Sequence, residues 1–393
     1  MSPHVHELLD LVIRWTHLIA GIMWIGNSML FNWLDRNLER PPDAASGFEG
    51  RIWMVHSGGF YDVVKKQLEP SQLPKTLHWF KWQNFSTWAS GIFLLLVVYY
   101  LGDSALLVDA GAGLGRGAAI GIGLGAVLGG WAVYDALWRS PLGKRPRLAS
   151  ALSLLLLLGL IYTLTHTLSG RAAYIHVGVV LGTIMTGNVW MVILPSQREL
   201  VAATAAGREQ DPALGKRAKQ RSIHNNYMTF PLLFIMISNH FPSTYGGRSG
   251  WVVLVVLMLG GALVRHFMNI RFHYPGWLTA ATVTGVLTLC GLYVLTRPQR
   301  LSTAGEQGAF SSAHAVIKRR CVACHSSMPT DEVWRVAPAN VMFDTPAQIK
   351  AMAARIRARA VDNKTMPLGN KTGMTDEERA VLGAWLERGA RID

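Results

Sequence analysis

The chain has 393 residues, half of them hydrophobic, and its mean hydropathy is positive. Such a composition is unusual for a soluble protein and indicates a membrane protein. The formal charge of +14 does not indicate a nucleic-acid-binding protein, because the basic residues fall in loops beside apolar segments and form no patch interleaved with aromatic residues.

Eight apolar segments of membrane-spanning length fill the first three quarters of the chain. They run approximately over residues 8–31, 84–102, 115–137, 149–168, 172–193, 226–240, 250–268 and 277–296. The sixth is short and contains Pro231. The sequence therefore predicts an all-α fold, with a polytopic membrane helix bundle of eight spans over residues 1–300. An even number of spans places both termini on the same side of the membrane.

The charged loops predict which side that is. Loops after the odd-numbered spans carry clusters of Lys and Arg, such as Arg36, Arg40 and Arg51 after the first span, whereas the intervening loops carry few. Loops rich in Lys and Arg stay in the cytoplasm. Both termini are therefore predicted to be periplasmic, in a multi-pass protein of a bacterial inner membrane. No cleavable signal peptide is evident, so we expect the first helix to direct insertion.

Similar stretches recur in the two halves of this bundle. GIMWIGN ends at Asn27 and GTIMTGN ends at Asn188, while NFSTW begins at Asn84 and NYMTF begins at Asn226. Their common order suggests a duplicated four-helix unit, four plus four. The four amides would then converge near the cytoplasmic side, where polar groups at membrane depth are functional candidates. The alternative is that they only cap helix ends or hydrogen-bond across helices.

The histidines fall in two layers along the predicted membrane normal. The outer layer holds His17, His166, His176 and His240, and the inner layer holds His56, His78, His224, His266 and His273. Paired imidazoles on facing helices can hold a b-type haem, so His17 and His176 are candidates for an electron relay. The alternative is that these histidines are interfacial or hydrogen-bonded, with no iron.

Near the C-terminus, RRCVACHSSMPT contains the C-x-x-C-H pattern to which a c-type haem is attached. Cys321 and Cys324 would form thioethers with the haem vinyl groups, and His325 would ligate the iron. A structural zinc site would need a second Cys or His pair at metal spacing, and none follows. The third cysteine, Cys290, stands alone in an apolar segment, where we expect a buried thiol.

The composition changes after residue 300 to a charged, Ala-rich sequence, which predicts a small class I-like cytochrome c domain over residues 301–393. Helices are predicted over 309–320, from Thr345 and from Thr375, the last two with capping-box sequences. The loop NKTMPLGN presents Met366 as the second axial ligand, which with His325 would give an electron-transfer haem. The other methionines that compete for this role are Met328, Met342, Met352 and Met374.

Four stretches together resemble the membrane-bound urate oxidases, the PuuD family. They are RWTHLIAGIMWIGNSMLFNWLD, LHWFKWQNFSTWASG, HVGVVLGTIMTGNVWMVILPSQ and the tail pattern CVACH with TMPLGN. The resemblance covers essentially the whole chain and includes the order of the two domains. It implies that the protein oxidises urate to 5-hydroxyisourate, and that electrons pass to its own haem and on to a respiratory acceptor instead of directly to oxygen.

The residues of the inner side suit this substrate. Urate is a planar anion, so its site needs amide groups, a cation and an aromatic face. The candidates are Asn27, Asn84, Asn188, Asn226, Thr87 and Thr229, with His224 or His266 to take the released proton. Arg265 would serve either as a topology anchor or as the substrate cation.

Two questions stay open from the sequence. The membrane core is about 30 Å thick, so either urate binds near the periplasmic face or cofactors bridge the bilayer to the haem. The alternative functions are a quinol-oxidising or other respiratory cytochrome subunit, and a transporter with an appended cytochrome.

Overall fold

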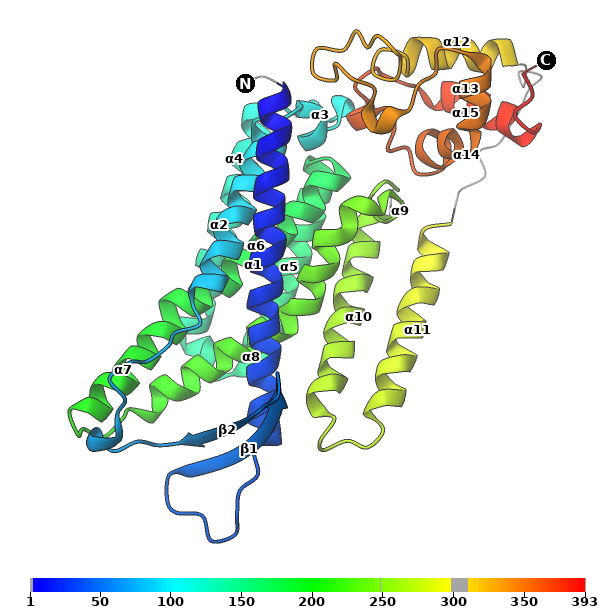
Figure 1. Ribbon diagram of the computed structural model, residues 1–393. Helices are drawn as coiled ribbons and strands as arrows, with labels where there is room; N and C mark the ends of the chain where they lie inside the picture. The colour runs from blue at the N-terminus through cyan, green and yellow to red at the C-terminus, as the bar shows by residue number, and fades with distance from the viewer. Residues whose placement is uncertain (1–2, 248, 298–309, 393) are drawn as a thin grey trace.

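The computed structural model describes residues 3–247, 249–297 and 310–392. They form two regions, which we call the bundle (residues 3–247 and 249–297) and the tail (residues 310–392). Figure 1 shows that the tail lies at the end of the bundle that also holds the N-terminus. We call this the tail end, and the opposite end the hairpin end. The predicted domain boundary after residue 300 lies outside the described residues.

The bundle is built from long helices, most of them joined by short connections (Figure 1). The long helices are α1 (Pro3–Asn37), α2 (Trp82–Leu94), α4 (Arg116–Arg139), α5 (Pro146–Thr167), α6 (Gly170–Asn188), α7 (Leu194–Ala205), α8 (Pro212–Ile237), α10 (Gly250–Ile270) and α11 (Trp277–Leu295). The π-helical turn Leu95–Tyr100 extends α2, and the π-helical turn Val189–Ile193 joins α6 to α7. Two short helices, α3 (Ser104–Leu107) and α9 (Pro242–Tyr245), lie at the tail end.

All eight predicted spans fall largely within helices. Among the described residues, six helices are long and apolar enough to cross a membrane by length and composition. The other two predicted spans lie in α2 with its π-helical turn and in the second half of α8, followed by the turn Ser238–His240. Helix α2 begins with polar side chains, and the first half of α8 is strongly charged. The count of eight spans therefore stays a prediction.

Helix α6 lies at the centre of the bundle, where it packs against α2, α4, α5 and α8. The most apolar part of Gly170–Ala205 is 61% buried, whereas the corresponding parts of α1 and α11 are 6% and 0% buried. Apolar surfaces of this size are rare on soluble proteins, and lipid around α1 and α11 would account for them. The predicted repeat equates α1 with α6, but the two helices occupy different environments.

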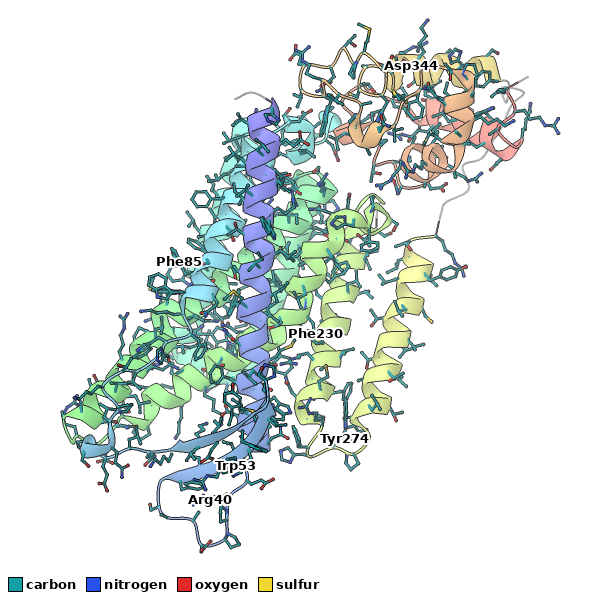
Figure 2. All side chains as sticks on the ribbon, viewed as in Figure 1. Arg40, Trp53, Phe85, Phe230, Tyr274 and Asp344 are labelled. Carbon is teal, nitrogen blue, oxygen red and sulfur yellow. The ribbon has the colours of Figure 1, made fainter. Side chains whose placement is uncertain are left out.

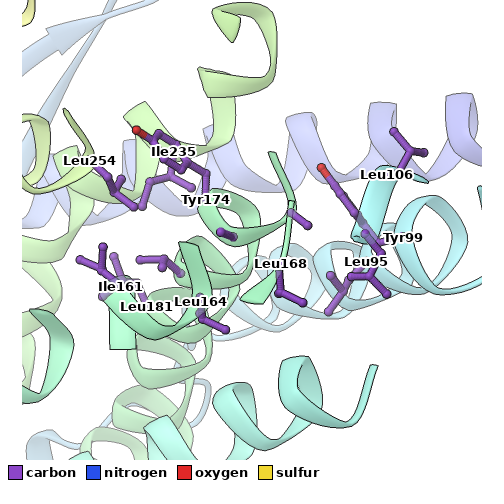
Figure 3. Close-up of a cluster of buried hydrophobic side chains, with 14 of the residues drawn as sticks. Leu95, Tyr99, Leu106, Ile161, Leu164, Leu168, Tyr174, Leu181, Ile235 and Leu254 are labelled. Carbon is purple, nitrogen blue, oxygen red and sulfur yellow. The ribbon is translucent and has the colours of Figure 1, made fainter. Parts of the chain in front are cut away.

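The main core of the bundle joins α5, α6, α8 and α10 with the π-helical turn after α2 (Figure 3). Its side chains include Leu95, Tyr99, Leu164, Leu168, Tyr174, Leu181, Ile235 and Leu254. Close packing of such side chains is what holds helices together when lipid replaces water around them. By contrast Cys290 on α11 is exposed. The prediction of a buried thiol is wrong, because only one side of α11 packs against the bundle, along α10.

The fold is not entirely α-helical, because a β-hairpin follows α1. Strands β1 (Phe48–His56) and β2 (Gly59–Lys66) pair antiparallel and are joined by Ser57 and Gly58. Both turn residues have positive φ, at 49° and 76°, as the favoured two-residue hairpin turns require. The hairpin lies at the end of the bundle away from the tail, near the α10–α11 turn that Tyr274 marks in Figure 2.

The tail is a small helical unit with a core of its own. Its helices are α12 (Phe310–Arg320), α13 (Pro346–Ala351), α14 (Ala353–Ile356) and α15 (Asp376–Glu387). The predicted helix over 309–320 is confirmed as α12 from Phe310, and residue 309 lies outside the described part. Both predicted capping boxes are confirmed, Thr345 with Gln348 and Thr375 with Glu378.

Candidate functional site

The C-x-x-C-H motif follows directly from the end of α12. Helix α12 packs against α15, and Arg320 at its end is held by Glu378 at 2.9 Å. The next turn carries Cys321, Cys324 and His325. His325 Nδ1 lies 3.0 Å from the carbonyl oxygen of Val341, and Nε2 has no hydrogen-bond partner among the described residues. This arrangement fits iron ligation, because a hydrogen bond at one ring nitrogen orients the other toward a metal.

Burial and nearby carboxylates raise the pKa of both thiols of this motif. Burial raises the pKa of Cys321 to about 12. Burial and the nearby carboxylate of Asp331 raise the pKa of Cys324 to about 11. Two thiols three residues apart beside an oriented imidazole fit a covalently held haem.

The methionines of the tail occupy different surroundings. Met374 is 3% exposed within the core, and Met352 packs against the same core. Met328 is 83% exposed. Met366 is half-buried and lies outside the core cluster, in a loop held by hydrogen bonds from its N–H to the Arg359 carbonyl and from Arg379 to its own carbonyl. The tail core thus does not use Met328, Met342 or Met366, and of these Met342 and Met366 are half-buried.

In the bundle, four consecutive residues of α8 connect it to three other helices. His224 Nδ1 lies 2.6 Å from the hydroxyl of Tyr134 on α4. Asn225 accepts a hydrogen bond from Asn188 Nδ2 on α6 at 2.8 Å. Asn226 accepts from Arg265 Nε at 3.0 Å and Asn269 Nδ2 at 2.7 Å, both on α10, and the Tyr227 hydroxyl lies 2.7 Å from His266 Nδ1. We call this set of side chains the inner network.

Asn84 joins α2 to α6 beside the inner network. Its amide nitrogen donates to Thr186 Oγ1 at 3.1 Å, and its oxygen accepts from Trp190 Nε1 at 3.1 Å. Asn188 is two residues further along α6 and also donates to the Tyr134 hydroxyl. The structure therefore connects Asn84, Asn188 and Asn226 through α6 and α8. These bonds across helices are the alternative role that the sequence left open.

The fourth amide does not join them. Asn27 is half-buried on α1 and makes no side-chain hydrogen bond to another described residue. The hydroxyls of Thr87 and Thr229 donate to carbonyls of their own helices, at 2.7 and 2.9 Å. The peripheral position of α1 is the reason that four equivalent amides do not meet.

Two buried arginines accompany the inner network. Arg265 is already a member, and Arg221, which we add to the network through its contact with Tyr134, was not singled out from the sequence. Arg265 is 6% exposed and bonded to Asn226, so it is not a freely solvated topology anchor. Arg221 is 1% exposed; its Nη2 donates to Asp135 at 3.0 Å, and its guanidinium lies 4.8 Å from the centre of the Tyr134 ring. Its Nη1 has no partner of normal geometry among the described residues. In the sequence Arg221 is one of several basic residues in the loop after the fifth predicted span, so nothing there distinguishes it from a topology signal.

The two histidines of the predicted relay face different partners. His17 Nδ1 lies 2.9 Å from the Thr87 carbonyl on α2. His176 is fully buried, with Nδ1 at 2.7 Å from the Ala172 carbonyl and Nε2 at 2.9 Å from the Tyr100 hydroxyl. Both ring nitrogens of His176 are therefore engaged. Iron ligation by His176 would require displacement of Tyr100, and the b-type haem stays a prediction.

The tail contacts the bundle through a charged cluster at α3. Asp103, the N-cap of α3, is 5% exposed and accepts hydrogen bonds from Lys371 Nζ at 3.1 Å and Trp334 Nε1 at 3.2 Å. Lys371 also pairs with Asp331 at 2.8 Å. Leu368 of the tail packs against the main core of the bundle. We call Asp103, Asp331, Trp334 and Lys371 the junction cluster.

The loop that carries Met366 lies at this junction. A Cβ at Gly369 would lie 2.5 Å from the Ala105 carbonyl of α3, and a Cβ at Gly246, after α9, would lie 2.5 Å from the Thr365 side chain. Glycine is therefore needed on both sides of the contact. Thr365 before Met366 and Gly369 after it are thus both packed against the bundle.

The comparison with known families covers the bundle. The model of the urate oxidase N-terminal family matches residues 3–296. The chain belongs to this family. No curated protein and no solved structure matches the chain.

Membership of the urate oxidase N-terminal family indicates an oxidoreductase acting on urate. The match contains the whole inner network and Asp103, whereas the C-x-x-C-H motif and Met366 lie beyond it. Among the described residues, no three His, Cys, Asp or Glu side chains are grouped so as to hold a metal ion. A haem iron needs no such group, because the porphyrin supplies its four equatorial nitrogens and the protein only the axial ligands.

Proposed function

We propose that this chain is a membrane-bound oxidoreductase that converts urate to 5-hydroxyisourate and passes the electrons to a c-type haem attached to its own tail. The observation that carries this proposal is the junction: a bundle of a urate oxidase family packs, through a buried carboxylate, against a tail that contains C-V-A-C-H. The bundle would lie in a bacterial inner membrane with eight spans, and the tail would lie in the periplasm.

The proposed reaction balances without oxygen. Water adds to the purine as a new C–O bond forms and an O–H bond of the water breaks. Each urate monoanion thus gives 5-hydroxyisourate, one proton and two electrons. A c-type haem, held by Cys321, Cys324 and His325, would take electrons one at a time and hand them to a respiratory acceptor. Met366 would provide the second axial ligand. Because oxygen is not the acceptor, no hydrogen peroxide is expected.

Two features of the chain support a purine anion as the substrate. The bundle carries buried or half-buried guanidinium groups at both ends, Arg221 and Arg265 in the inner network and Arg171 beside α9. Amides, imidazoles and aromatic rings accompany them. Planar, bidentate guanidinium donors suit an anion that carries neighbouring ring nitrogens and carbonyl oxygens.

The test is anaerobic addition of urate to the purified, haem-loaded protein while the absorption of the c-type haem is recorded. We expect the haem to become reduced. Failure of urate to reduce a haem that ascorbate does reduce would refute the proposal. Reduction by a quinol but not by urate would instead identify a respiratory cytochrome subunit. A pyridine haemochrome assay on the same sample tells whether b-type haem accompanies the c-type haem.

A further inference from the structure

A cavity of about 380 Å³ lies at the tail end of the bundle. It is formed where α5 ends, where α6 and α10 begin, and beside α9, which Figure 1 shows below α14 of the tail. Its walls include Thr165, His166, Tyr174, Tyr245 and Trp251. The volume falls within the range of small-molecule sites in proteins. None of the eight described residues that line it is acidic.

The cavity is a built feature of the fold, because its walls are fixed by close packing and hydrogen bonds. Tyr174 is fully buried, and its hydroxyl reaches the carbonyl oxygens of Thr244 at 2.7 Å and Gly250 at 2.6 Å. Helix α10 begins at Gly250, where a Cβ would lie 3.1 Å from the Tyr245 carbonyl, and the Cβ at Gly170, which begins α6, would lie closer still. Glycine at both helix starts lets them converge on Tyr245.

Aromatic rings line the cavity and surround it. Tyr174 and Tyr245 have ring centres 5.9 Å apart, and Trp251 lies 5.6 Å from Tyr162. His166 is 4.0 Å from the same Tyr162 ring, with Nδ1 bonded to the Tyr162 carbonyl and Nε2 without a partner among the described residues. Flat walls of this kind favour a planar ring system, which offers its faces to them.

Two guanidinium groups act on Tyr245, a wall residue of the cavity, and they come one from each region of the protein. Burial raises the pKa of the Tyr245 hydroxyl, and the nearby charges of Arg171 on α6 and Arg359 of the tail act in the opposite direction. Arg171 Nε is oriented by Asn239 at 3.2 Å. Since no lining residue is acidic, the potential in the cavity favours an anion. All eight lining residues belong to the bundle, and the tail contributes the nearby charge of Arg359.

The cavity also adjoins the loop of Met366. Tyr245 lines the cavity, and the next residue, Gly246, is in contact with Asn363 and Thr365 of the tail. Met366 follows Thr365, and its N–H donates to the carbonyl of Arg359. One short segment of the tail thus contacts a residue next to the cavity wall and carries the proposed haem ligand.

The inner network is not close to the loop of Met366. It lies in the half of the bundle nearer the hairpin, as Phe230 beside Arg265 shows in Figure 2. Electrons released there would have to cross much of an apolar layer about 30 Å thick. The predicted histidine relay does not shorten that path in this structure, because His176 already uses both ring nitrogens.

We propose that the cavity beside Tyr245 and Trp251 binds urate as its planar monoanion and is the place where urate is oxidised. This inference rests on the proposed function and specifies where the reaction occurs. The purine would stack against Trp251 and Tyr245, with Arg171 and Arg359 opposing its charge. The new C–O bond would form to a water molecule in the cavity, two electrons would leave one at a time toward the tail, and His166 Nε2 would accept a proton.

The experiment measures urate-driven haem reduction by stopped flow, in the full-length haem-loaded protein without oxygen, over a series of urate concentrations. In Arg359→Gln and Trp251→Leu we expect the half-saturating urate concentration to rise about tenfold or more, as for loss of one charged or stacking contact. Arg359→Lys, which keeps the charge, should remain within about threefold of the wild type.

His224→Gln tests the competing location, the inner network. The matched control is Trp53→Leu, an exposed side chain of β1, for which we expect less than about a twofold change in half-saturation. Haem reduction by ascorbate at an unchanged rate verifies that each variant is folded and loaded. The inference is overturned if His224→Gln raises the half-saturating concentration while both cavity variants behave as wild type. If urate fails to reduce the haem even in the wild type, it is the proposed function that fails.

Discussion

Lys371 Nζ lies 3.1 Å from Asp103 Oδ2, although the two residues are 268 positions apart in the chain. Asp103 belongs to the bundle and Lys371 to the tail, five residues after Met366. Asp103 is 5% exposed and also accepts a hydrogen bond from the indole N–H of Trp334. A buried carboxylate with these donors fixes both the distance and the orientation of the tail on the bundle, because losing a partner would leave a charge unpaired.

Replacing Lys371 with Met tests this contact. The variant leaves Asp103 with the Ala105 N–H of its own helix and the Trp334 indole as donors. The loss of one charged hydrogen bond, partly screened by solvent, is expected to cost roughly 1–3 kcal/mol of docking free energy. Urate-driven haem reduction should slow several-fold, while the absorption spectrum of the haem is unchanged. The charge-reversed pair Asp103→Lys with Lys371→Asp is expected to recover part of the rate. Equal rates in wild type and Lys371→Met would contradict a role in docking.

The junction cluster is expected to be insensitive to pH near neutrality. Burial alone would raise the pKa of Asp331, but hydrogen bonds from Lys371 and the backbone N–H groups of Trp334 and Val333 hold it at about 2. The contribution of Asp331 to the docking free energy is therefore full above about pH 4, where an unperturbed Asp is ionised, and is lost as the pH falls through about 2. Burial would lower the pKa of Lys371, but Asp331 and Asp103 raise it.

Because the pKa of Lys371 is raised, its contribution to the docking free energy is full below about pH 10 and is lost only as the pH rises further. Docking should thus stay constant from about pH 5 to 9 and weaken outside that range. The strength of docking at each pH is measured by the protection of the backbone amides of residues 363–371 from hydrogen exchange, corrected for the intrinsic pH dependence of exchange. A transition in their protection near pH 6.5 would show that a histidine, and not the junction cluster, controls docking.

Met366→Ala tests the axial ligand. Loss of the thioether should abolish the methionine–iron charge-transfer band and lower the reduction potential of the haem, because the methionine ligand raises that potential. Met328→Ala is the matched control, since this side chain is 83% exposed. If the band survives in Met366→Ala, Met342 is the next variant to examine, and the assignment of Met366 is wrong.

Gly123→Ala probes the packing around His176. A Cβ at Gly123 would lie 2.5 Å from His176 Nε2 and closer to the Tyr100 hydroxyl, so the hydrogen bond between them must shift. We expect a loss of about 1–3 kcal/mol in the free energy of unfolding. Gly125→Ala on the same helix has nothing within 4 Å of the new Cβ and should be neutral or stabilising by up to about 1 kcal/mol. Thermal unfolding in one detergent compares the two.

The sequence by itself determined the local structure of this protein. Apolar runs of sufficient length gave helices at all eight expected places, and Thr345 and Thr375 began helices because a capping box satisfies the first backbone N–H groups with nearby side chains. The hairpin was missed although its sequence signal was present, namely the pair Ser57 and Gly58 between two stretches with β-branched and aromatic residues. Both residues adopt positive φ in the structure. All of these patterns involve residues a few positions apart.

Only the tertiary structure decided which helix face is buried and which distant residues meet. It placed α6 at the centre and α1 at the edge, so that Asn188 is bonded and Asn27 is not. It turned Arg221 and Arg265 from apparent loop charges into buried donors, and it brought Lys371 to Asp103. Apolar helices carry similar sequence patterns whether they face lipid or protein, so their packing order, and every site that depends on it, is fixed only when they assemble.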